Sequence, residues 1–170
     1  MDRLDRRAGE TLYHLEMRSP DDVQASRPLP ADVTLSEQRD LLLIRAVTLS
    51  IGQPYDWPSQ HWNDSRWADH LNRHNLRHWT VQRAGDILGL ASLRFDQAEV
   101  ELDTFGLVPR HVDTGLGGPF LALVAELAWR EAPQTERLWL HTSSADHPYA
   151  LRNYLARGFR QYRPVLPTDW

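Results

Sequence analysis

The chain has 170 residues, a length that suits one domain built around a single hydrophobic core. Its 19 basic and 23 acidic residues are intermixed and leave a net charge of −4, which argues against a nucleic-acid partner. The sequence contains no cysteine, so disulfides, thiolate nucleophiles and cysteine-ligated metals are excluded. It contains no lysine either, which excludes Schiff-base chemistry on a lysine.

No apolar run approaches the length of a membrane span, and the charged N-terminal residues lack the apolar segment of a signal peptide. The sequence therefore predicts a cytoplasmic protein with no membrane partner. We expect a single domain over residues 1–170, with the charged residues 1–10 disordered.

The first half of the chain mixes strand-like and helix-like patterns. The expected elements are a strand at 12–18, a helix at 36–49, a short helix at 64–73, and two hairpin strands at 79–83 and 87–95. We expect Ser36 to cap the longer helix and Gly52 to end it. The tripeptide 84–86, with its central glycine, is the expected hairpin turn.

The most informative segment begins at residue 100. Residues 100–108 form a β-type run that ends before Pro109, and a glycine-rich turn then opens into a helical pattern of apolar residues from Phe120 to Ala128. Glycines let backbone N–H groups converge, and the dipole of the following helix favours negative charge. The pattern predicts a binding site for a phosphate or pyrophosphate group.

Two common phosphate motifs do not fit this turn. A P-loop needs a lysine after its second glycine, and the chain has none. A dinucleotide-binding fingerprint needs a third glycine where Phe120 stands. The turn around Gly115 and Gly117 is similar instead to the Arg/Gln-x-x-Gly-x-Gly/Ala loop of the GNAT superfamily of acyl-CoA N-acyltransferases. The chain departs from that pattern at Val112, which occupies the Arg/Gln position, with Arg110 two residues upstream.

A second block supports the resemblance. Residues 136–142 predict a strand, and residues 146–159 predict a helix with Asp146 as its cap and Gly158 as its end. That helix resembles the superfamily block Asn-x-x-Ala-x-x-x-Tyr-x-x-x-Gly-Phe, with His147 in place of the asparagine. The matching residues are Ala150, Tyr154, Gly158 and Phe159. The two blocks together are similar to a bacterial subgroup of the superfamily.

The resemblance implies an α/β (α+β) fold with a central mixed, mostly antiparallel sheet flanked by helices. Coenzyme A would lie in the gap between two splayed parallel strands, which end at Val108 and Thr142. The implied activity is transfer of an acetyl group from acetyl-CoA, without a metal, to a primary amine of a small molecule or peptide. With no cysteine to carry the acyl group, the amine would attack directly in a ternary complex. Two alternatives stay open: a non-catalytic acyl-CoA-binding domain, and a biosynthetic enzyme of the same fold that uses another acyl group.

The resemblance also implies which residues bind coenzyme A. The expected residues are Phe105, Leu107, Val108, Val112, Asp113, Thr114, Gly115, Leu116, Gly117, Gly118, His147, Asn153 and Tyr154. A backbone N–H in 105–107 would bind the thioester carbonyl. Tyr154 occupies the position where many relatives place the acid that protonates the departing thiolate, although a tyrosine that only packs in the core would fit the pattern too.

Acyl transfer to an ammonium group also needs a base. Glu101 is the first candidate and Asp103 the second, since residues two apart on a strand share a face. A solvated strand face would explain both carboxylates equally well. His141 is the competing candidate because its imidazole suits proton transfer at neutral pH, while a buried histidine bonded to neighbouring backbone is the alternative.

The acceptor would lie under the aromatic segment 55–62. Tyr55, Trp57 and Trp62 could bind an apolar amine or surround a cation, or simply anchor the loop, and Asp56 could pair with an ammonium group. His141, Asp146 and His147 are the only group that suggests a metal, but we expect none, because Asp146 more simply caps a helix.

Three histidines with four-residue spacing, His70, His74 and His78, are expected on a solvated face. A homodimer is possible. Residues 163–170 are short for the final hairpin usual in this fold, which leaves open what closes that side of the sheet.

Overall fold

The computed structural model describes residues 9–163. The expected disorder of residues 1–10 and most of the short C-terminal segment therefore lie outside the described residues. The elements in chain order are β1 Leu12–Met17, β2 Val33–Gln38, α1 Leu41–Gly52, α2 Asp64–Leu71, β3 Leu76–Arg83, β4 Asp86–Asp96, β5 Glu99–Leu107, α3 Gly117–Glu131, β6 Arg137–Ser143, α4 Ala150–Ala156 and β7 Arg160–Arg163. Short 3-10 turns join several of them.

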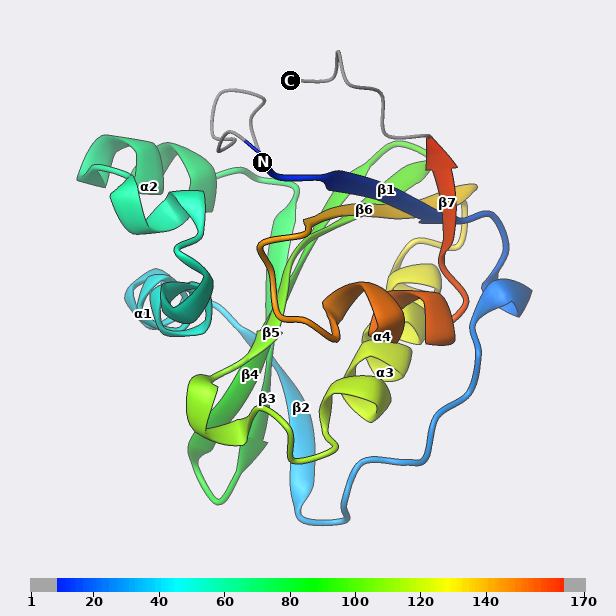
Figure 1. The fold of residues 1–170 in the computed structure, drawn as a ribbon, viewed down its shortest axis with the longest axis horizontal. Coiled ribbons are helices and arrows are strands. Elements are labelled where there is room, and N and C mark those ends of the chain that lie inside the picture. The colour runs from blue at the N-terminus through cyan, green and yellow to red at the C-terminus, as the bar shows by residue number, and fades with distance from the viewer. Residues whose placement is uncertain (1–8, 164–170) are drawn as a thin grey trace.

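The described strands form one sheet in the order β2-β3-β4-β5-β6-β1-β7. Every neighbouring pair is antiparallel except β5 and β6, which are parallel. Helices α1 and α2 lie on one side of the sheet, and α3 and α4 lie on the other (Figure 1). The expected mixed, mostly antiparallel sheet flanked by helices is thus confirmed.

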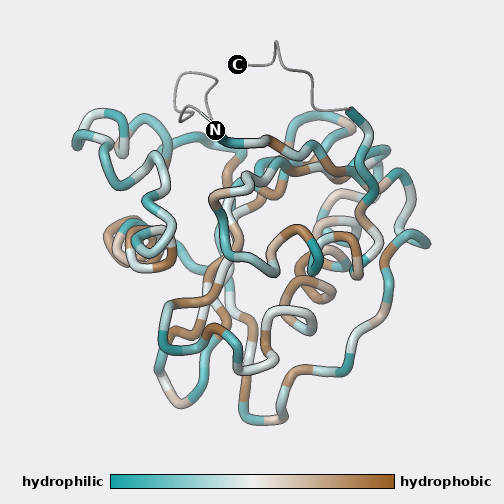
Figure 2. Tube along the Cα trace, in the orientation of Figure 1, coloured by the Kyte–Doolittle hydropathy of each residue, from teal (hydrophilic) through white to brown (hydrophobic). Residues whose placement is uncertain are grey.

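Two apolar clusters hold these layers together. The larger one packs α3 against the sheet, with Phe120 and Leu121 fully buried beside strand residues such as Leu15. The smaller one packs α1 and α2 against the other face through Ile44 and Trp67. Figure 2 shows the apolar residues gathered in α1, α3 and the central strands, whereas α2 is largely hydrophilic. Apolar packing therefore holds both helical layers on the sheet, and the polar residues of α2 are not needed for that packing.

The parallel strands separate soon after they meet. Residues Glu99–Glu101 of β5 pair with Arg137–Trp139 of β6, and no pairing between the two strands follows in the described chain. Strand β5 stays paired to β4 on its other side as far as Leu107. One edge of β5 therefore presents unpaired backbone groups to the gap, as the splayed-strand expectation requires.

A β-bulge interrupts β5 at the point where the strands separate. Leu102 lies opposite Leu93 and Thr104 lies opposite Ser92, which leaves Asp103 without a partner on β4. An extra residue of this kind bends a strand and re-aims its side chains. The bulge decides where the carboxylate of Asp103 points.

The predicted first strand is confirmed as β1, an internal strand of the sheet. It lies between β6 and β7 and pairs antiparallel with β6 over its whole length, from Leu12 to Met17. Arg137 of β6 donates a 2.7 Å hydrogen bond to Glu16 of β1, which fastens the two strands. The N-terminal strand thus completes the layer beside the β5–β6 gap (Figure 1).

Two predicted helix starts are wrong. Ser36 lies within β2, opposite Thr80, and the cap of α1 is Asp40, whose side chain accepts bonds from the N–H groups of Leu42 and Leu43. Pairing with β3 determines the conformation of residues 33–38, so Ser36 adopts a strand conformation and does not cap a helix. The last helix begins at Ala150 rather than after Asp146, because the Asp146 carboxylate is engaged elsewhere.

Two glycine-based predictions are confirmed. The β3–β4 turn contains Ala84 and Gly85, both with positive φ, as a tight two-residue hairpin turn requires. Gly158 ends the last helix at a φ of 105°, and a Cβ there would lie 1.9 Å from the carbonyl oxygen of Asp22. Only glycine fits that position.

Candidate functional site

Two cavities meet above the gap between β5 and β6. The glycine-loop cavity, of about 430 Å³, is lined by the residues around Gly115, Gly117 and Gly118 and by α4. The histidine cavity, of about 610 Å³, extends to α2 and to the β3 and β4 strands and is lined by His70 and His78. The residues that line both are Trp57, Phe105, Asp146 and Tyr154. A molecule in one cavity can therefore touch a molecule in the other.

The glycine loop has the backbone shape of an anion site. Asp113 and Gly115 both have positive φ, at 61° and 80°, which turns the chain from β5 into α3. The cap residue Leu116 provides no side-chain cap, so the N–H groups of Gly117 and Gly118 have no capping side chain in the described structure. A Cβ at Gly117 would meet only Asn153, at 3.6 Å. Two backbone N–H groups without a capping side chain and a helix dipole thus lie at the wall of the cavity, with room above Gly117 and with Ser26 and Asn153 near Gly118.

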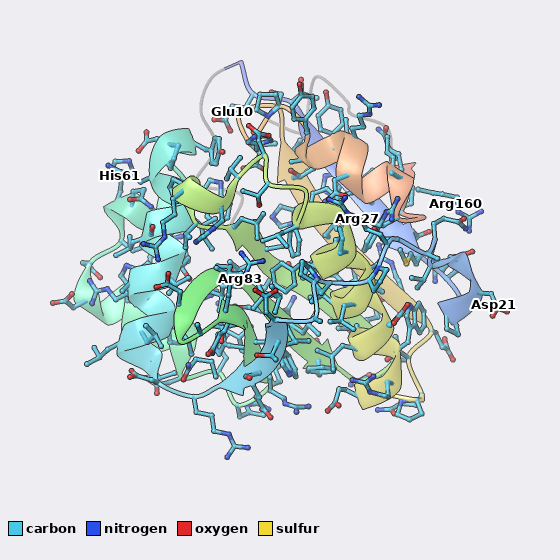
Figure 3. All side chains as sticks on the ribbon, turned by 90° about the horizontal axis from the view of Figure 1, so that it is seen from below. Glu10, Asp21, Arg27, His61, Arg83 and Arg160 are labelled. Atoms are coloured by element: carbon cyan, nitrogen blue, oxygen red, sulfur yellow. The ribbon has the colours of Figure 1, made fainter. Side chains whose placement is uncertain are left out.

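Arg27 holds this loop from outside. Its Nη2 donates a 2.8 Å hydrogen bond to the carbonyl oxygen of Gly115, and a Cβ on Gly115 would lie 1.9 Å from that nitrogen. Figure 3 shows Arg27 beside the chain near α3. Arg110, which the sequence offered as a basic residue for the loop, pairs with Asp86 at 3.1 Å instead. The positive charge nearest the turn therefore comes from the β1–β2 connection, which lies far away in sequence.

His147 lies on the opposite wall of the glycine-loop cavity. The backbone N–H of Tyr149 donates to its Nδ1 at 3.1 Å, which leaves the proton of the neutral ring on Nε2, 3.8 Å from Asp113. The ring of Tyr55 packs edge-on against it at 5.9 Å. Tyr55, which was expected to contact the acceptor, lines the glycine-loop cavity and not the histidine cavity.

Tyr154 of α4 lies where the cavities join. Its ring packs against Phe105 and Phe159, and only 9% of the residue is exposed. Burial, followed by the charge of Asp146, raises the pKa of the phenol, so Tyr154 stays protonated at neutral pH. In the described part of the chain no hydrogen bond engages its hydroxyl. The group can therefore donate a proton to a ligand in either cavity.

Asp146 fastens the aromatic segment over this junction. Its carboxylate accepts hydrogen bonds from Trp57 Nε1 at 2.7 Å, from the Thr142 hydroxyl at 2.5 Å and from the Ser143 N–H at 2.9 Å. Trp57 packs on Gly52, where a Cβ would lie 2.8 Å from the indole. Asp146 thus joins the α1–α2 connection to the end of β6, and this role replaces the predicted helix cap.

The floor of the histidine cavity carries a buried histidine–aspartate pair. His70 Nε2 lies 3.1 Å from Asp103 Oδ2, with 14% and 5% of the two side chains exposed. Burial alone would raise the pKa of the Asp103 carboxyl, but the hydrogen bond and charge of His70, helped by the Thr104 hydroxyl, outweigh it and lower that pKa to about 2. With His70 as its partner, Asp103 is therefore a carboxylate at neutral pH.

His78 of β3 lies on the same floor. Its Nδ1 is 2.7 Å from the Ser92 hydroxyl, and its Nε2 has no hydrogen-bond partner in the described residues although only 4% of the residue is exposed. Burial lowers the pKa of His78 to about 4, so the ring is neutral at pH 7. The prediction that the histidines occupy a solvated face is wrong for His70 and His78. His74 is the exposed one of the three.

Glu101, the first candidate for the base, is committed to another partner. Arg94 Nε and Nη2 donate to the same oxygen of Glu101, at 2.8 and 2.5 Å, and Glu101 is 5% exposed. Arg94 lines the histidine cavity and Glu101 lines neither cavity. The second candidate, Asp103, does line the histidine cavity, and so does His141, whose ring lies 6.2 Å from that of His14.

Trp57 and Trp62, both expected to contact the acceptor, have different surroundings. Trp57 lines both cavities, and Trp62 lines the histidine cavity, where it packs against Trp67, His70 and the guanidinium of Arg66. Asp56 lies outside both linings and pairs with His61 at 2.7 Å, which replaces its expected role with an ammonium group. His61 lies at the outer edge of the molecule (Figure 3).

Most residues expected to bind coenzyme A share one wall. Those lining the glycine-loop cavity are Phe105, Leu107, Val112, Asp113, Gly115, Gly117, Gly118, His147, Asn153 and Tyr154. Val108 and Leu116 are buried in the cores instead, and the Thr114 hydroxyl donates to the carbonyl oxygen of His111. Sequence reasoning missed the wall residues Ile51, Tyr149 and Arg152, and in the other cavity His70, His78 and Arg94.

Residues 9–163 contain neither a cluster of metal-ligating side chains nor a helix that could span a membrane. No group of three or more histidine, aspartate or glutamate side chains in that range is arranged to hold a metal ion. In the same range, no helix is both long and apolar enough to cross a membrane.

Comparison with solved structures gives the same fold. A GCN5-related N-acetyltransferase from Kribbella flavida matches with a TM-score of 0.61 and 18% identity, over 90% of this chain and 56% of its own. A tandem GNAT protein from the clavulanic acid biosynthesis pathway matches with a TM-score of 0.63 and 18% identity, over 93% of this chain and 52% of its own. This chain therefore spans about half the length of those proteins.

A third structure is matched over nearly its full length. It is an aminoglycoside acetyltransferase from an uncultured soil metagenomic sample, with a TM-score of 0.62 and 11% identity, over 79% of this chain and 93% of its own. No curated protein sequence matches this chain. The model of the acetyltransferase (GNAT) family matches residues 44–159, more than half of the chain and the whole of both cavity walls from α1 to α4. The chain belongs to the GNAT acetyltransferase family.

Proposed function

We propose that this protein transfers an acetyl group from acetyl-CoA to a primary amine of a small molecule or peptide. The observation that carries the proposal is the junction of the two cavities at Tyr154, with a backbone anion site in one and an ionised carboxylate in the other. A donor with a pyrophosphate fits the first cavity, and a cationic amine fits the second. The two would meet at the shared wall.

The glycine-loop cavity fits coenzyme A on its own geometry. The N–H groups of Gly117 and Gly118 would bind the pyrophosphate, with the α3 dipole behind them. The unpaired edge of β5 at 105–107 would hold the acetyl carbonyl through a backbone N–H. Bound acetyl-CoA supplies an activated acetyl group as a thioester.

Tyr154 then has a defined task. Its phenol is protonated at neutral pH and lies at the junction, so it would donate a proton to the departing thiolate. The amine would attack from the histidine cavity while both molecules are bound, because the chain has no cysteine to carry the acetyl group. Trp57, held by Asp146, would cover the junction and keep water from the thioester.

Two measurements test the proposal. Acetyl-CoA should raise the unfolding temperature by mass action, and a panel of primary amines should then cause release of free thiol from acetyl-CoA, with acetylated amine found by mass spectrometry. A thermal shift without amine-dependent thiol release by any member of the panel would favour a non-catalytic binding domain. No thermal shift with any acyl-CoA would contradict the proposal as a whole.

A further inference from the structure

We infer that His70, oriented by Asp103, is the base that takes the proton from the acceptor's ammonium group. The inference deepens the proposed function, on which it rests. It begins from position: His70 and Asp103 come from different elements, α2 and the β5 bulge, and meet on the floor of the histidine cavity. The pair includes neither of the other two candidate bases, Glu101 of β5 and His141 of β6.

The hydrogen bond fixes the tautomer of His70. Asp103 is ionised and can only accept, so the neutral ring must carry its proton on Nε2, facing Asp103 Oδ2 at 3.1 Å. The lone pair is then on Nδ1, and the imidazolium formed on protonation is stabilised by the Asp103 carboxylate. This is the arrangement of a histidine base that is oriented by a carboxylate. Asp103 acts through His70 and is a positioning residue.

The charges around His70 favour a cationic acceptor. On β4, the Arg94 guanidinium is paired with Glu101 of β5, and on β3 His78 is neutral. On this floor the Asp103 carboxylate has Arg94 nearby, whose guanidinium is already paired with Glu101. The remaining charged residues of the lining are Arg66, Asp69, Arg73 and Asp146. A protonated primary amine bound on this floor would lie beside the Asp103 carboxylate, with His78 in the same wall.

The floor lies within reach of the reaction centre. Asp103 precedes Phe105 by two residues on β5, a separation of about 7 Å along a strand, and the Phe105 ring packs against Tyr154. His70 and Tyr154 also line the same cavity, so an amine bound there would lie between the base and the reaction centre.

The protons balance across the reaction. The ammonium gives one proton to His70, which passes it to solvent, and the free amine forms a bond to the acetyl carbon. The carbon–sulfur bond breaks, the nitrogen loses its second proton, and the thiolate gains one from Tyr154, which is restored by that second proton. The products are an amide, coenzyme A as the thiol and one proton.

The pH dependence of kcat/KM tests the inference. His70→Gln should lower kcat/KM by roughly 10²–10⁴-fold and abolish the acidic limb of the profile. Asp103→Asn should lower it less and keep a displaced limb, because His70 is still present. His74→Gln is the matched control, a histidine three residues beyond α2 that lines neither cavity, and should leave the profile unchanged. Survival of the limb in His70→Gln, or its loss in Glu101→Gln or His141→Gln instead, would overturn the inference.

Two further readouts separate a catalytic role from a structural one. Millimolar imidazole should partly restore turnover in His70→Ala, because the deleted ring leaves a space in an open cavity, and failure of rescue together with a normal acetyl-CoA thermal shift would count against a base at this position. The pKa of the Asp103 carboxyl, followed by carbon NMR, should rise from about 2 in His70→Gln, since burial is then left without the compensating partner. An unchanged value would show that the pair does not form.

The failure of this inference can be told from failure of the proposed function. If the wild-type protein transfers acetyl groups to amines and His70→Gln keeps the acidic limb, only the assignment of the base is wrong. If the wild-type protein gives no amine-dependent thiol release, both are wrong.

Discussion

Tyr154 is the residue that touches both cavities from α4 and still carries a proton at neutral pH. Removing only its oxygen should separate chemistry from packing. We expect Tyr154→Phe to lower kcat by about tenfold or more while the thermal shift with acetyl-CoA stays the same, because the hydroxyl acts on the leaving thiolate and not on binding. Steady-state kinetics and thermal unfolding of the two proteins measure this. Equal kcat values would reduce Tyr154 to a packing residue.

His78 should make the protein's stability depend on pH in a defined window. Burial lowers its pKa to about 4 from an unfolded value near 6.5, so the unfolded chain binds the extra proton first. Its contribution to stability is complete above pH 6.5 and is lost as the pH falls towards 4, by about 1.4 kcal/mol per unit. Denaturant unfolding between pH 7 and pH 4 should show this slope, and His78→Gln should flatten it.

The control for that measurement is His74→Gln, which removes an exposed histidine from the same part of the chain. It should keep the slope of the parent protein. If His78→Gln is less stable at every pH but keeps the same slope, another group is responsible for the pH dependence.

The glycine loop and the first turn of α3 together form the proposed anion site. The N–H groups of Gly117 and Gly118 have no capping side chain, and a Cβ at Gly117 would meet only Asn153. We expect Gly117→Asp to fold but to lose the thermal shift with acetyl-CoA, because its carboxylate places negative charge where the pyrophosphate would bind. Gly117→Ala is the matched variant, with added volume but no charge, and should keep part of the shift. Equal shifts for both variants and the parent would place the donor elsewhere.

The whole molecule depends on β1 as the strand between β6 and β7. Leu15, at its centre, is fully buried and belongs to the larger core. We expect Leu15→Ala to lower the free energy of unfolding by about 2–5 kcal/mol, through lost burial and the cavity left behind. Leu42→Ala, at a leucine of α1 that is 80% exposed, should change it little. Urea unfolding compares the two, and a cost at Leu15 no greater than at Leu42 would show that β1 is not part of the stable sheet.

Much of the fold could be predicted because its signals are local. Gly158 needs a positive φ, the 84–86 turn has a glycine where a hairpin wants one, and the spacing of apolar residues marks α3. The predicted helix start at Ser36 was wrong because a contact between distant parts of the chain decided the conformation there. A capping signal and a strand signal competed over the same residues, and pairing with β3, which is forty residues away, decided between them.

The sequence by itself determined the family, the glycine turn, the order of the elements from α1 to α4 and Tyr154 as a residue of the cavity wall, because each depends on short stretches with fixed spacing. Only the tertiary structure decided which of the carboxylates of Glu101 and Asp103 lines the histidine cavity. A bulge in β5 directs Asp103 towards α2, and Arg94 of the neighbouring strand β4 pairs with Glu101. It also brought His70 and His78 to one floor and placed β1 beside β6. Such contacts join residues far apart in the chain, and their energies depend on burial and neighbours that no local pattern contains.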